Sequence, residues 1–309
     1  MPSTLHDPVL LESVMNIFIK PDTKKHIVVD ATLGLGGHAS EMCKTLKKED
    51  IFIGFDRDSE NLKKASEYIE SVQKNIYPIL IHSSFSQLKE RLMERNIKEI
   101  DFILYDLGVS SVHYDDSIRG FSLRNDGPLD MRFNRKEGKT AADLIHTLDV
   151  RELSKIFTLY GEEKKSWFIA QAIVKAREKK KIETTFELID IIEKSSFDKK
   201  SSLRVFQAIR IALNEEFTHI ESSLKQALEL LAVGGKIAVI TFHSLEDRLV
   251  KNIFTQYLED TINETTGQIE IPSQYRKYTK KPIIPTDEEI HNNPRSRSAK
   301  MRIIERIRI

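Results

Sequence analysis

The sequence predicts an α/β protein with a doubly wound, mostly parallel sheet that is interrupted by an inserted all-helical domain. Short apolar runs alternate with amphipathic segments over residues 27–106, a rhythm typical of a parallel sheet with helices on both faces. A glycine-rich turn follows the first apolar run. Only helical patterns then appear over residues 140–213, before the strand patterns resume.

Each expected element rests on its local pattern, since apolar runs predict buried strands and helical spacing of apolar residues predicts helices. We expect strands at 27–30, 51–56, 76–81 and 100–106, with helices at 40–48, 59–72 and 85–95. The insertion should contain helices at 141–148, 150–160, 165–180, 185–195 and 203–213. The remainder should form a helix at 215–231 that stops at Val233-Gly234-Gly235, a strand at 236–241, a helix at 244–257, an extended segment at 275–285, a short turn or helix at 287–290 and a strand at 299–309. The expected domains are residues 1–114 with 214–309, and the helical insertion 115–213.

Composition limits the class of protein. The formal net charge of the 309 residues is +1, so any affinity for nucleic acid must come from local patches. Cys43 is the lone cysteine, which excludes an internal disulfide and fits a reducing compartment. Residues 1–11 lack a signal-peptide pattern, and no apolar run reaches membrane-spanning length. We therefore expect a cytoplasmic protein without a membrane partner.

The glycine-rich turn reads Asp30-Ala31-Thr32-Leu33-Gly34-Leu35-Gly36-Gly37-His38-Ala39. Strand, glycine turn and helix commonly form a site for a nucleotide-like ligand, because glycine lets a ligand approach the backbone. The spacing of Gly34, Gly36 and Ala39 formally matches a dinucleotide-binding motif. Asp30 argues against that ligand, since its carboxylate would repel a pyrophosphate. A ligand with an ammonium and a sulfonium group fits better, and S-adenosylmethionine is such a ligand.

Two residues that follow the next strands are candidates for further ligand contacts. Asp56 ends the second strand, where an acidic side chain accepts hydrogen bonds from ribose hydroxyls. Its alternative role is to cap the next helix. Phe85 follows the third strand, where an adenine can stack against its ring. Spacing supports a core position for Phe85 nearly as well.

Asp106 closes the fourth strand, over the same crevice as the glycine turn. The exocyclic amine of cytosine is a poor nucleophile, and a carboxylate that accepts its N–H bonds and later its proton would assist methyl transfer. An Asp106 that contacts only the cofactor is an equally weighted alternative. Cys43 lies away from this crevice, which argues against methylation of pyrimidine carbon 5, because that reaction needs a cysteine nucleophile.

Three other charged stretches have competing interpretations. In Phe242-His243-Ser244-Leu245-Glu246-Asp247-Arg248, His243 can relay a proton, or Ser244 and the acids after it can cap a helix. A metal site on His243, Glu246 and Asp247 would lack further ligands. The loop at 120–132 can fold over a base or form a structural turn. The basic run at 175–181, together with Arg276, Lys277, Lys280, Lys281, Arg295 and Arg297, can follow a phosphate backbone or form a solvated face.

Several long strings occur together and in one order: His6-Asp7-Pro8-Val9-Leu10-Leu11, Gly36-Gly37-His38, Asp106-Leu107-Gly108-Val109-Ser110-Ser111, Arg119-Gly120-Phe121-Ser122, Asp126-Gly127-Pro128-Leu129-Asp130-Met131-Arg132, Tyr160-Gly161-Glu162-Glu163, Phe206-Gln207-Ala208-Ile209-Arg210-Ile211, the 242–248 string above, and Asn293-Pro294-Arg295-Ser296-Arg297-Ser298. Over nearly the whole chain they resemble the RsmH family, also called MraW, of small-subunit ribosomal RNA cytidine N4-methyltransferases.

The resemblance implies a class I, Rossmann-like methyltransferase fold whose helical insertion helps to recognise substrate. It implies methyl transfer from S-adenosylmethionine to N4 of a cytidine in the decoding region of 16S ribosomal RNA. It places cofactor contacts at Gly36, Gly37, His38, Asp56, Phe85, Asp106 and His113, and leaves open a homodimer and whether free RNA or an assembled or assembling subunit is the substrate. His113 replaces the usual Gln, and residues 199–205 also depart from the family pattern.

Two other classes of function remain as alternatives at this point. A nicotinamide-dependent oxidoreductase would use the formal dinucleotide motif, although Asp30 opposes it, and a binding assay with both cofactors distinguishes the two. A catalytically silent RNA-binding factor would bind the methyl donor without transferring the methyl group. The intact glycine turn and Asp106 oppose that interpretation.

Overall fold

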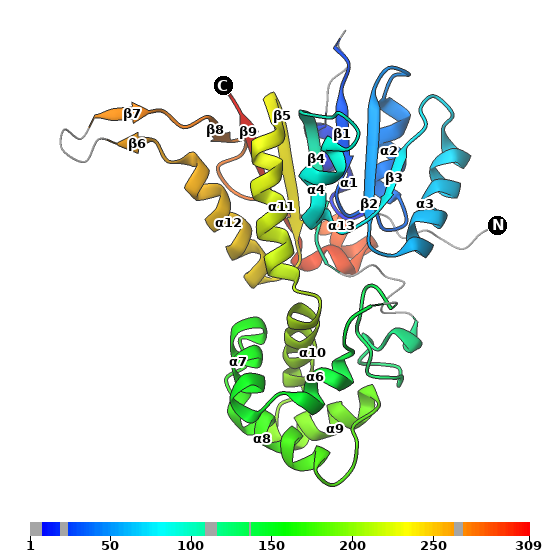
Figure 1. The fold of residues 1–309 in the computed structure, drawn as a ribbon, viewed down its shortest axis with the longest axis vertical. Coiled ribbons are helices and arrows are strands. Elements are labelled where there is room, and N and C mark those ends of the chain that lie inside the picture. The colour runs from blue at the N-terminus through cyan, green and yellow to red at the C-terminus, as the bar shows by residue number, and fades with distance from the viewer. Residues whose placement is uncertain (1–7, 19–23, 109–115, 136, 263–267) are drawn as a thin grey trace. The chain divides into compact units, whose positions relative to one another are not determined.

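The computed structural model describes residues 8–18, 24–108, 116–135, 137–262 and 268–309 (Figure 1). The chain divides into two compact units, of which one contains residues 1–108 and 218–309 and the other residues 109–217. The division lies a few residues outside the expected insertion of 115–213 at both ends. Each unit is described by itself below.

A seven-stranded sheet forms the centre of the first unit (Figure 1). Its order is β3 (Ile79–His82), β2 (Ile51–Asp56), β1 (Ile27–Asp30), β4 (Ile100–Asp106), β5 (Leu231–Thr241), β9 (Lys300–Arg306) and β8 (Tyr275–Lys277). The pairings from β3 to β5 are parallel, and those of β9 with β5 and β8 are antiparallel. The expected doubly wound, mostly parallel sheet is confirmed.

Helices cover both faces of this sheet, which is why its strands consist of continuous apolar runs. The helices of this unit are α1 (Leu11–Ile17), α2 (Gly37–Thr45), α3 (Ser59–Val72), α4 (Leu88–Met93), α11 (Glu216–Leu230), α12 (Ser244–Leu258) and α13 (Asp287–Asn292), with the 3-10 turns η1 (Phe85–Gln87) and η3 (Pro294–Ser298), and α13 has no buried residue. Phe52, Phe102 and Tyr105 are among the largest fully buried side chains. Apolar burial of this kind is the main stabilising contribution to the fold.

Several boundaries differ from the sequence predictions for local reasons. β3 begins at Ile79 instead of residue 76, because the side chain of Gln73 bonds both the amide and the carbonyl of Ile76 and holds these residues in a turn. β5 begins at Leu231 instead of residue 236. Its pairing with β4 shifts register after Ile100, so that Gly234 with φ 84° lies in a bulge of the strand instead of a free helix stop.

The segment after α12 contains a feature that the sequence analysis missed. β6 (Thr261–Ile262) pairs with β7 (Ile269–Ile271) as a separate two-stranded ribbon (Figure 1). Ile262, Ile269 and Ile271 are all exposed. A strand with no buried face has no alternation of apolar and polar residues, and this explains why the pattern gave no strand prediction there.

The second unit is helical, as expected. It contains η2 (Ser117–Arg119), α6 (Ala141–Thr147), α7 (Val150–Gly161), α8 (Ser166–Arg177), α9 (Thr185–Ser196) and α10 (Lys200–Leu213). Reciprocal capping boxes begin α6, α7 and α9, and each satisfies backbone donors at a helix start. The unit has its own apolar core, in which Ile145, Phe157, Ile169, Ile192 and Ile209 are fully buried.

The string at 160–163 and the divergent segment at 199–205 contact each other inside this helical unit. A Cβ atom on Gly161 would lie 2.6 Å from the carbonyl oxygen of Arg204, so glycine permits the close approach of α7 and α10. Glu163 is buried and bonds Nε of Arg204 at 2.6 Å, and Asp198 bonds the same guanidinium at 2.7 Å. The divergent segment 199–205 therefore contributes the cation of a buried ion pair.

No helix in the described part of the chain is long and apolar enough to cross a membrane.

Candidate active site

The strand order reverses between β1 and β4, because β1 continues to β2 and β3 on one side while β4 continues to β5 on the other. In open parallel sheets, ligands bind beyond the carboxyl ends of the strands at such a reversal. Asp30 is the last residue of β1 and Asp106 is the last residue of β4. The topology therefore brings two carboxyl groups, far apart in the sequence, to the two sides of this point.

The glycine turn connects β1 to α2 through two residues in the left-handed region. Gly34 has φ 53° and Gly36 has φ 83°, a region that favours glycine. A Cβ atom on Gly36 would lie 3.2 Å from Cβ of Ala65, and one on Gly37 would lie 2.7 Å from Cγ of Pro8. Close packing of the protein is thus a second reason for glycine here, besides the backbone access for a ligand that the sequence suggested.

Asp56 holds this turn against the end of β2. Oδ2 of Asp56 accepts hydrogen bonds from the amide of Gly34 at 2.9 Å and from Nδ2 of Asn61 at 3.3 Å, while Oδ1 accepts one from the amide of Asp58 at 2.7 Å. The helix cap of α3 is Asp58 and not Asp56, so the capping alternative for Asp56 is wrong. Burial raises the pKa of Asp56 to about 6. Its remaining lone pairs are suited to hydroxyl donors.

Asp106 carries the most unusual carboxyl group of the site. Its side chain is 27% exposed, yet its Oδ1 atom is buried and has no hydrogen-bond partner among the described residues. Burial, followed by the charges of Asp30 and Glu246, raises its pKa to about 8. A buried polar atom without a partner is rare in folded proteins, and this oxygen is available to accept a hydrogen bond from a ligand.

Thr32 links the two strand ends. Its amide donates to Oδ1 of Asp30 at 3.0 Å, and its hydroxyl oxygen accepts a hydrogen bond from the amide of Asp106 at 2.6 Å. Asp30 is 2% exposed, and its pKa is raised to about 7, mainly by burial. The sequence analysis missed Thr32, because only the pairing of β1 with β4 brings it beside Asp106.

His38 lies on α2 with its ring buried behind Asp106. Nε2 lies 2.9 Å from the carbonyl oxygen of Val9, and Nδ1 lies 3.7 Å from Oδ2 of Asp106. Burial lowers the pKa of His38 to about 4, so the ring is neutral at neutral pH. Because a carbonyl can only accept, Nε2 carries the proton and Nδ1 presents its lone pair to Asp106.

The 242–248 string begins α12 next to this group. His243, and not Ser244, is the N-cap, and it forms a capping box with Glu246, whose Oε2 accepts a hydrogen bond from the amide of Phe242 at 2.8 Å. Asp247 bonds Arg302 at 2.6 and 3.1 Å. The weighed metal site is therefore not assembled, and no group of three potential metal ligands occurs among the described residues.

The remaining predicted residues are placed as follows. Phe85 is half-buried at the start of η1, where its ring packs edge-on against Tyr105 with centroids 5.8 Å apart. Cys43 is buried in α2, and burial raises the pKa of its thiol. His113 lies outside the described residues. Gly108 follows β4 and Phe242 follows β5, and the two residues pack closely, since a Cβ atom on Gly108 would lie 3.3 Å from the ring of Phe242.

The loop at 120–132, in the helical unit, is a structural turn. A Cβ atom on Gly120 would lie 2.3 Å from the carbonyl oxygen of Pro128, and one on Gly127 would lie 2.0 Å from that of Ser117. The guanidinium of Arg119 donates to the carbonyl oxygens of Arg132 and Phe133 at 3.3 and 3.0 Å. These contacts favour the structural interpretation of the turn that the sequence analysis left open.

The site therefore has three features: a tight glycine turn, acidic groups at the ends of β1, β2 and β4, and a neutral imidazole behind the last of them. Asp30, Asp106 and Glu246 are close enough for each charged neighbour to raise the pKa of Asp106. Carboxyl groups that repel one another favour a cationic ligand, because its charge relieves the repulsion. A pyrophosphate would add negative charge and increase the repulsion.

Comparison with known proteins agrees with this chemistry. The model of the MraW methylase family matches residues 3–307. The chain is 42% identical over 313 residues to the ribosomal RNA small subunit methyltransferase H of Clostridioides difficile, over 98% of this chain and 99% of that protein. It is 44% identical over 314 residues to the protein of the same name from Bacteroides fragilis, over 98% of both. The chain is a methyltransferase, and it belongs to the MraW methylase family.

Proposed function

We propose that this methyltransferase transfers a methyl group from S-adenosylmethionine to N4 of a cytidine in the decoding region of 16S ribosomal RNA. The observation that carries the proposal is the Asp106 carboxyl, with a buried oxygen that lacks a partner among the described residues, at the reversal of strand order. The relatives named above are small-subunit ribosomal RNA methyltransferases, and the motifs of this chain resemble the cytidine N4 family.

The residues present fit S-adenosylmethionine, which supplies a methyl group on a positively charged sulfur when bound. The carboxyl groups of Asp30 and Asp106 fit its cationic groups. A nearby positive charge would stabilise the ionised carboxylates and lower their raised pKa values. The amides of Gly37, His38 and Ala39 at the start of α2 have no intrahelical acceptor and suit its carboxylate. Asp56 suits the ribose hydroxyls, and the half-buried ring of Phe85 suits the adenine.

We assign the cofactor contacts to Gly36, Gly37, His38, Asp56, Phe85, Asp106 and His113. We also assign His38 to the positioning of Asp106, because its neutral Nδ1 lies 3.7 Å from Oδ2 of that carboxyl. The helical unit is assigned to recognition of the RNA. Whether the RNA is free or within an assembled subunit is left to the experiment.

Asp106 is the proposed proton acceptor. Its unpartnered Oδ1 can accept an N–H bond from the exocyclic amine, which localises the nitrogen lone pair that attacks the methyl carbon. The attack would form the N–C bond and displace the sulfur of a bound donor, which would keep the electron pair of the broken C–S bond. The amine then loses a proton to Asp106, whose raised pKa makes it a stronger base than an ordinary aspartate. Alignment of the reacting atoms supplies much of the acceleration.

The test is incubation of the full chain with a labelled methyl donor and small subunits from a strain that lacks this modification. Mass analysis of the digested RNA should find one methylated cytidine with the methyl on N4. Purified 16S RNA in a parallel reaction distinguishes free RNA from subunits. Methylation at carbon 5, or of another base, would overturn the assignment, and binding of nicotinamide cofactors in place of the methyl donor would overturn the class of reaction.

A further inference from the structure

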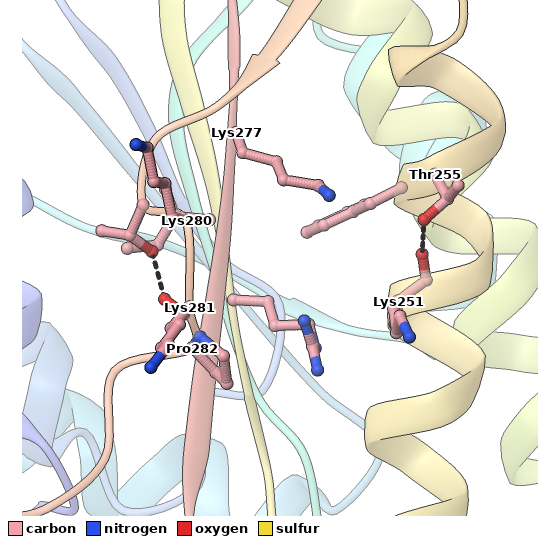
Figure 2. Close-up of a pocket in the computed structure, with 10 residues that line it drawn as sticks. Lys251, Thr255, Lys277, Lys280, Lys281 and Pro282 are labelled. Atoms are coloured by element: carbon pink, nitrogen blue, oxygen red, sulfur yellow. Dashed lines mark hydrogen bonds between the residues drawn. The ribbon is translucent and has the colours of Figure 1, made fainter.

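A pocket with an excess of positive charge lies between α12 and the edge of the sheet formed by β8 and β9 (Figure 2). Lys251 of α12, Lys277 of β8, and Lys280 and Lys281 of the loop after β8 line it, over a floor that includes Phe254 and Ile303. We call this the lysine pocket. It belongs to the first unit and lies at the opposite edge of the sheet from β3.

The strand register directs Lys277 into the pocket. Tyr275, two residues earlier in β8, packs edge-on against Tyr257 of α12 with ring centroids 5.8 Å apart. Residues two apart in a strand share a face, so Lys277 also extends toward α12, as Figure 2 shows. A position that faces a covering helix is normally apolar, and here it carries an ammonium group.

The loop that carries Lys280 and Lys281 is anchored at both ends on β9. The amide of Tyr278 donates to the carbonyl oxygen of Ile303 at 3.1 Å, and Ile283 exchanges hydrogen bonds of 2.9 and 2.8 Å with Met301. Between these anchors, the hydroxyl of Thr279 donates to the carbonyl oxygen of Lys281 at 2.7 Å. The two lysines therefore project from a preformed loop, which reduces the entropic cost of binding a ligand.

The described residues do not neutralise the positive charge of the lysine pocket. No ion pair of Lys251, Lys277, Lys280 or Lys281 occurs among the described residues, and no carboxylate lines the pocket. The neighbouring acids Asp247 and Glu305 are engaged, since Asp247 bonds Arg302 at 2.6 Å and Glu305 bonds Arg276 at 2.8 Å. Four lysines that line one pocket favour an anion, because a negative charge relieves the repulsion among their positive charges.

The polar groups of the pocket are suited to a backbone phosphate and not to a base. The hydroxyls of Thr255 and Thr279 already donate to backbone oxygens at 2.8 and 2.7 Å, and Phe254 is 5% exposed and offers no open ring face. What remains is a set of ammonium point charges, which bind phosphate without reading sequence. We propose that the lysine pocket binds a backbone phosphate of the RNA substrate.

This inference rests on the proposed function for the identity of the polymer. The sequence analysis grouped Lys277, Lys280 and Lys281 with Arg276, Arg295, Arg297 and the run at 175–181. The structure separates this set, because Arg276 pairs with Glu305, and it adds Lys251 from α12. The pocket thus gives the RNA a fixed point on the sheet unit, distinct from the carboxyl end of β4 where the chemistry takes place.

The test compares the full-length wild type with the double variant Lys277→Gln/Lys281→Gln. A matched control, Lys63→Gln/Lys64→Gln, removes the same charge from two exposed lysines of α3, which packs beside β2 and β3. Binding to a 16S RNA transcript is followed by fluorescence anisotropy over a range of KCl concentrations. We expect the pocket variant to bind RNA about tenfold more weakly. The plot of log affinity against log salt should become less steep, by roughly 0.7–0.9 for each phosphate that the variant no longer neutralises. The control should resemble the wild type.

Further measurements separate this proposal from its alternatives. Equal weakening in the pocket variant and the control would overturn it, as would an unchanged affinity in the pocket variant. Cytidine monophosphate that binds the wild type as tightly as RNA, and loses affinity in the pocket variant, would mean a nucleotide site and not an RNA contact. For the pocket variant, KM for RNA should rise while kcat at saturating RNA stays the same. Because RNA binding is measured without turnover, a wild type that methylates no RNA would refute the proposed function while the binding comparison still decides the pocket.

Discussion

Nδ1 of His38 lies 3.7 Å from Oδ2 of Asp106, and the imidazole is held from its other side by the carbonyl of Val9. The lowered pKa of His38 keeps the ring neutral, and the raised pKa of Asp106 keeps that carboxyl protonated over much of the neutral range. The neutral imidazole presents its Nδ1 lone pair toward Asp106, although 3.7 Å is too long for a hydrogen bond. The neighbour of Oδ2 is therefore an acceptor, which favours the protonated form of the Asp106 carboxyl before any ligand binds.

Replacement of Asp106 should separate its two proposed roles. Asp106→Asn keeps an oxygen that accepts an N–H bond but is not a base, so we expect kcat to fall by roughly 10²–10⁴. Asp106→Ala removes both functions and should abolish measurable transfer while the chain remains folded. Single-turnover transfer assays and thermal denaturation measure the two effects.

Asp101→Asn is the matched control for Asp106→Asn, because Asp101 lies at the opposite end of β4. It bonds Lys24 and the amide of Ile27 at 2.6 and 2.8 Å and has no place in the proposed chemistry. Transfer by this variant should stay near the wild-type rate. Wild-type turnover by Asp106→Ala would remove Asp106 from the mechanism.

The rate of transfer should depend on pH in a defined direction. Asp106 must be ionised to act as a base, and its raised pKa means that it ionises only as the pH approaches about 8. We therefore expect kcat/KM for the methyl donor, which reports the enzyme before the donor binds, to rise through this range. The positive donor should lower the pKa of Asp106, so the profile of kcat should rise at lower pH. A flat profile in both parameters would contradict the assignment.

Asp30→Asn should increase the free energy of unfolding at high pH and weaken donor binding. The pKa of Asp30 is raised to about 7, mainly by burial, so the folded protein holds this proton more tightly than the unfolded chain. The stability that this provides is complete below an ordinary aspartate pKa and is lost as the pH rises toward about 7. Asparagine avoids the loss, which amounts to up to about 4 kcal/mol for a shift of this size. Denaturant titrations at pH 5 and pH 8 should therefore show a stabilising effect that is larger at the higher pH.

Asp56→Ala should weaken donor binding by about 1–3 kcal/mol, through the loss of charge-assisted hydrogen bonds to the ribose and of its bond to the amide of Gly34. Calorimetric titration with the donor measures this loss. Asp58→Ala is the control, because it removes the cap of α3 at a cost of about 1 kcal/mol in stability while it leaves the bonds between Asp56 and the glycine turn in place. If both variants bind the donor equally well, the ribose assignment is wrong.

Cys43 should be dispensable for transfer. Its side chain is buried, and burial raises the pKa of the thiol, so it is not a ready nucleophile. Cys43→Ala should keep transfer within a few-fold of the wild type and reduce stability by about 1 kcal/mol. Loss of transfer in a folded Cys43→Ala protein would reopen methylation at carbon 5.

The local patterns were sufficient to predict the sheet, its helices and the helical insertion, because burial on both faces requires continuous apolar runs in strands such as β2 and β4. They also predicted that Asp30, Asp56 and Asp106 end their strands, since each follows directly on such a run. Where the apolar side chains of a segment are exposed, as Ile262, Ile269 and Ile271 are in β6 and β7, the same reasoning predicted no strand. Hydrophobic patterns also do not predict side-chain hydrogen bonds, such as those of Gln73 to Ile76, that delay the start of a strand.

The amino-acid sequence by itself determined the fold class, the family and the candidate carboxylates, because these depend on residue types at short spacings. Only the tertiary structure decided which groups meet. The pairing of β1 with β4 places Thr32 between Asp30 and Asp106, α2 turns His38 toward Asp106, and α12 places Lys251 at the pocket that Lys277 faces. The raised and lowered pKa values follow from these contacts, since burial and the proximity of charge arise only when distant segments of the chain pack together.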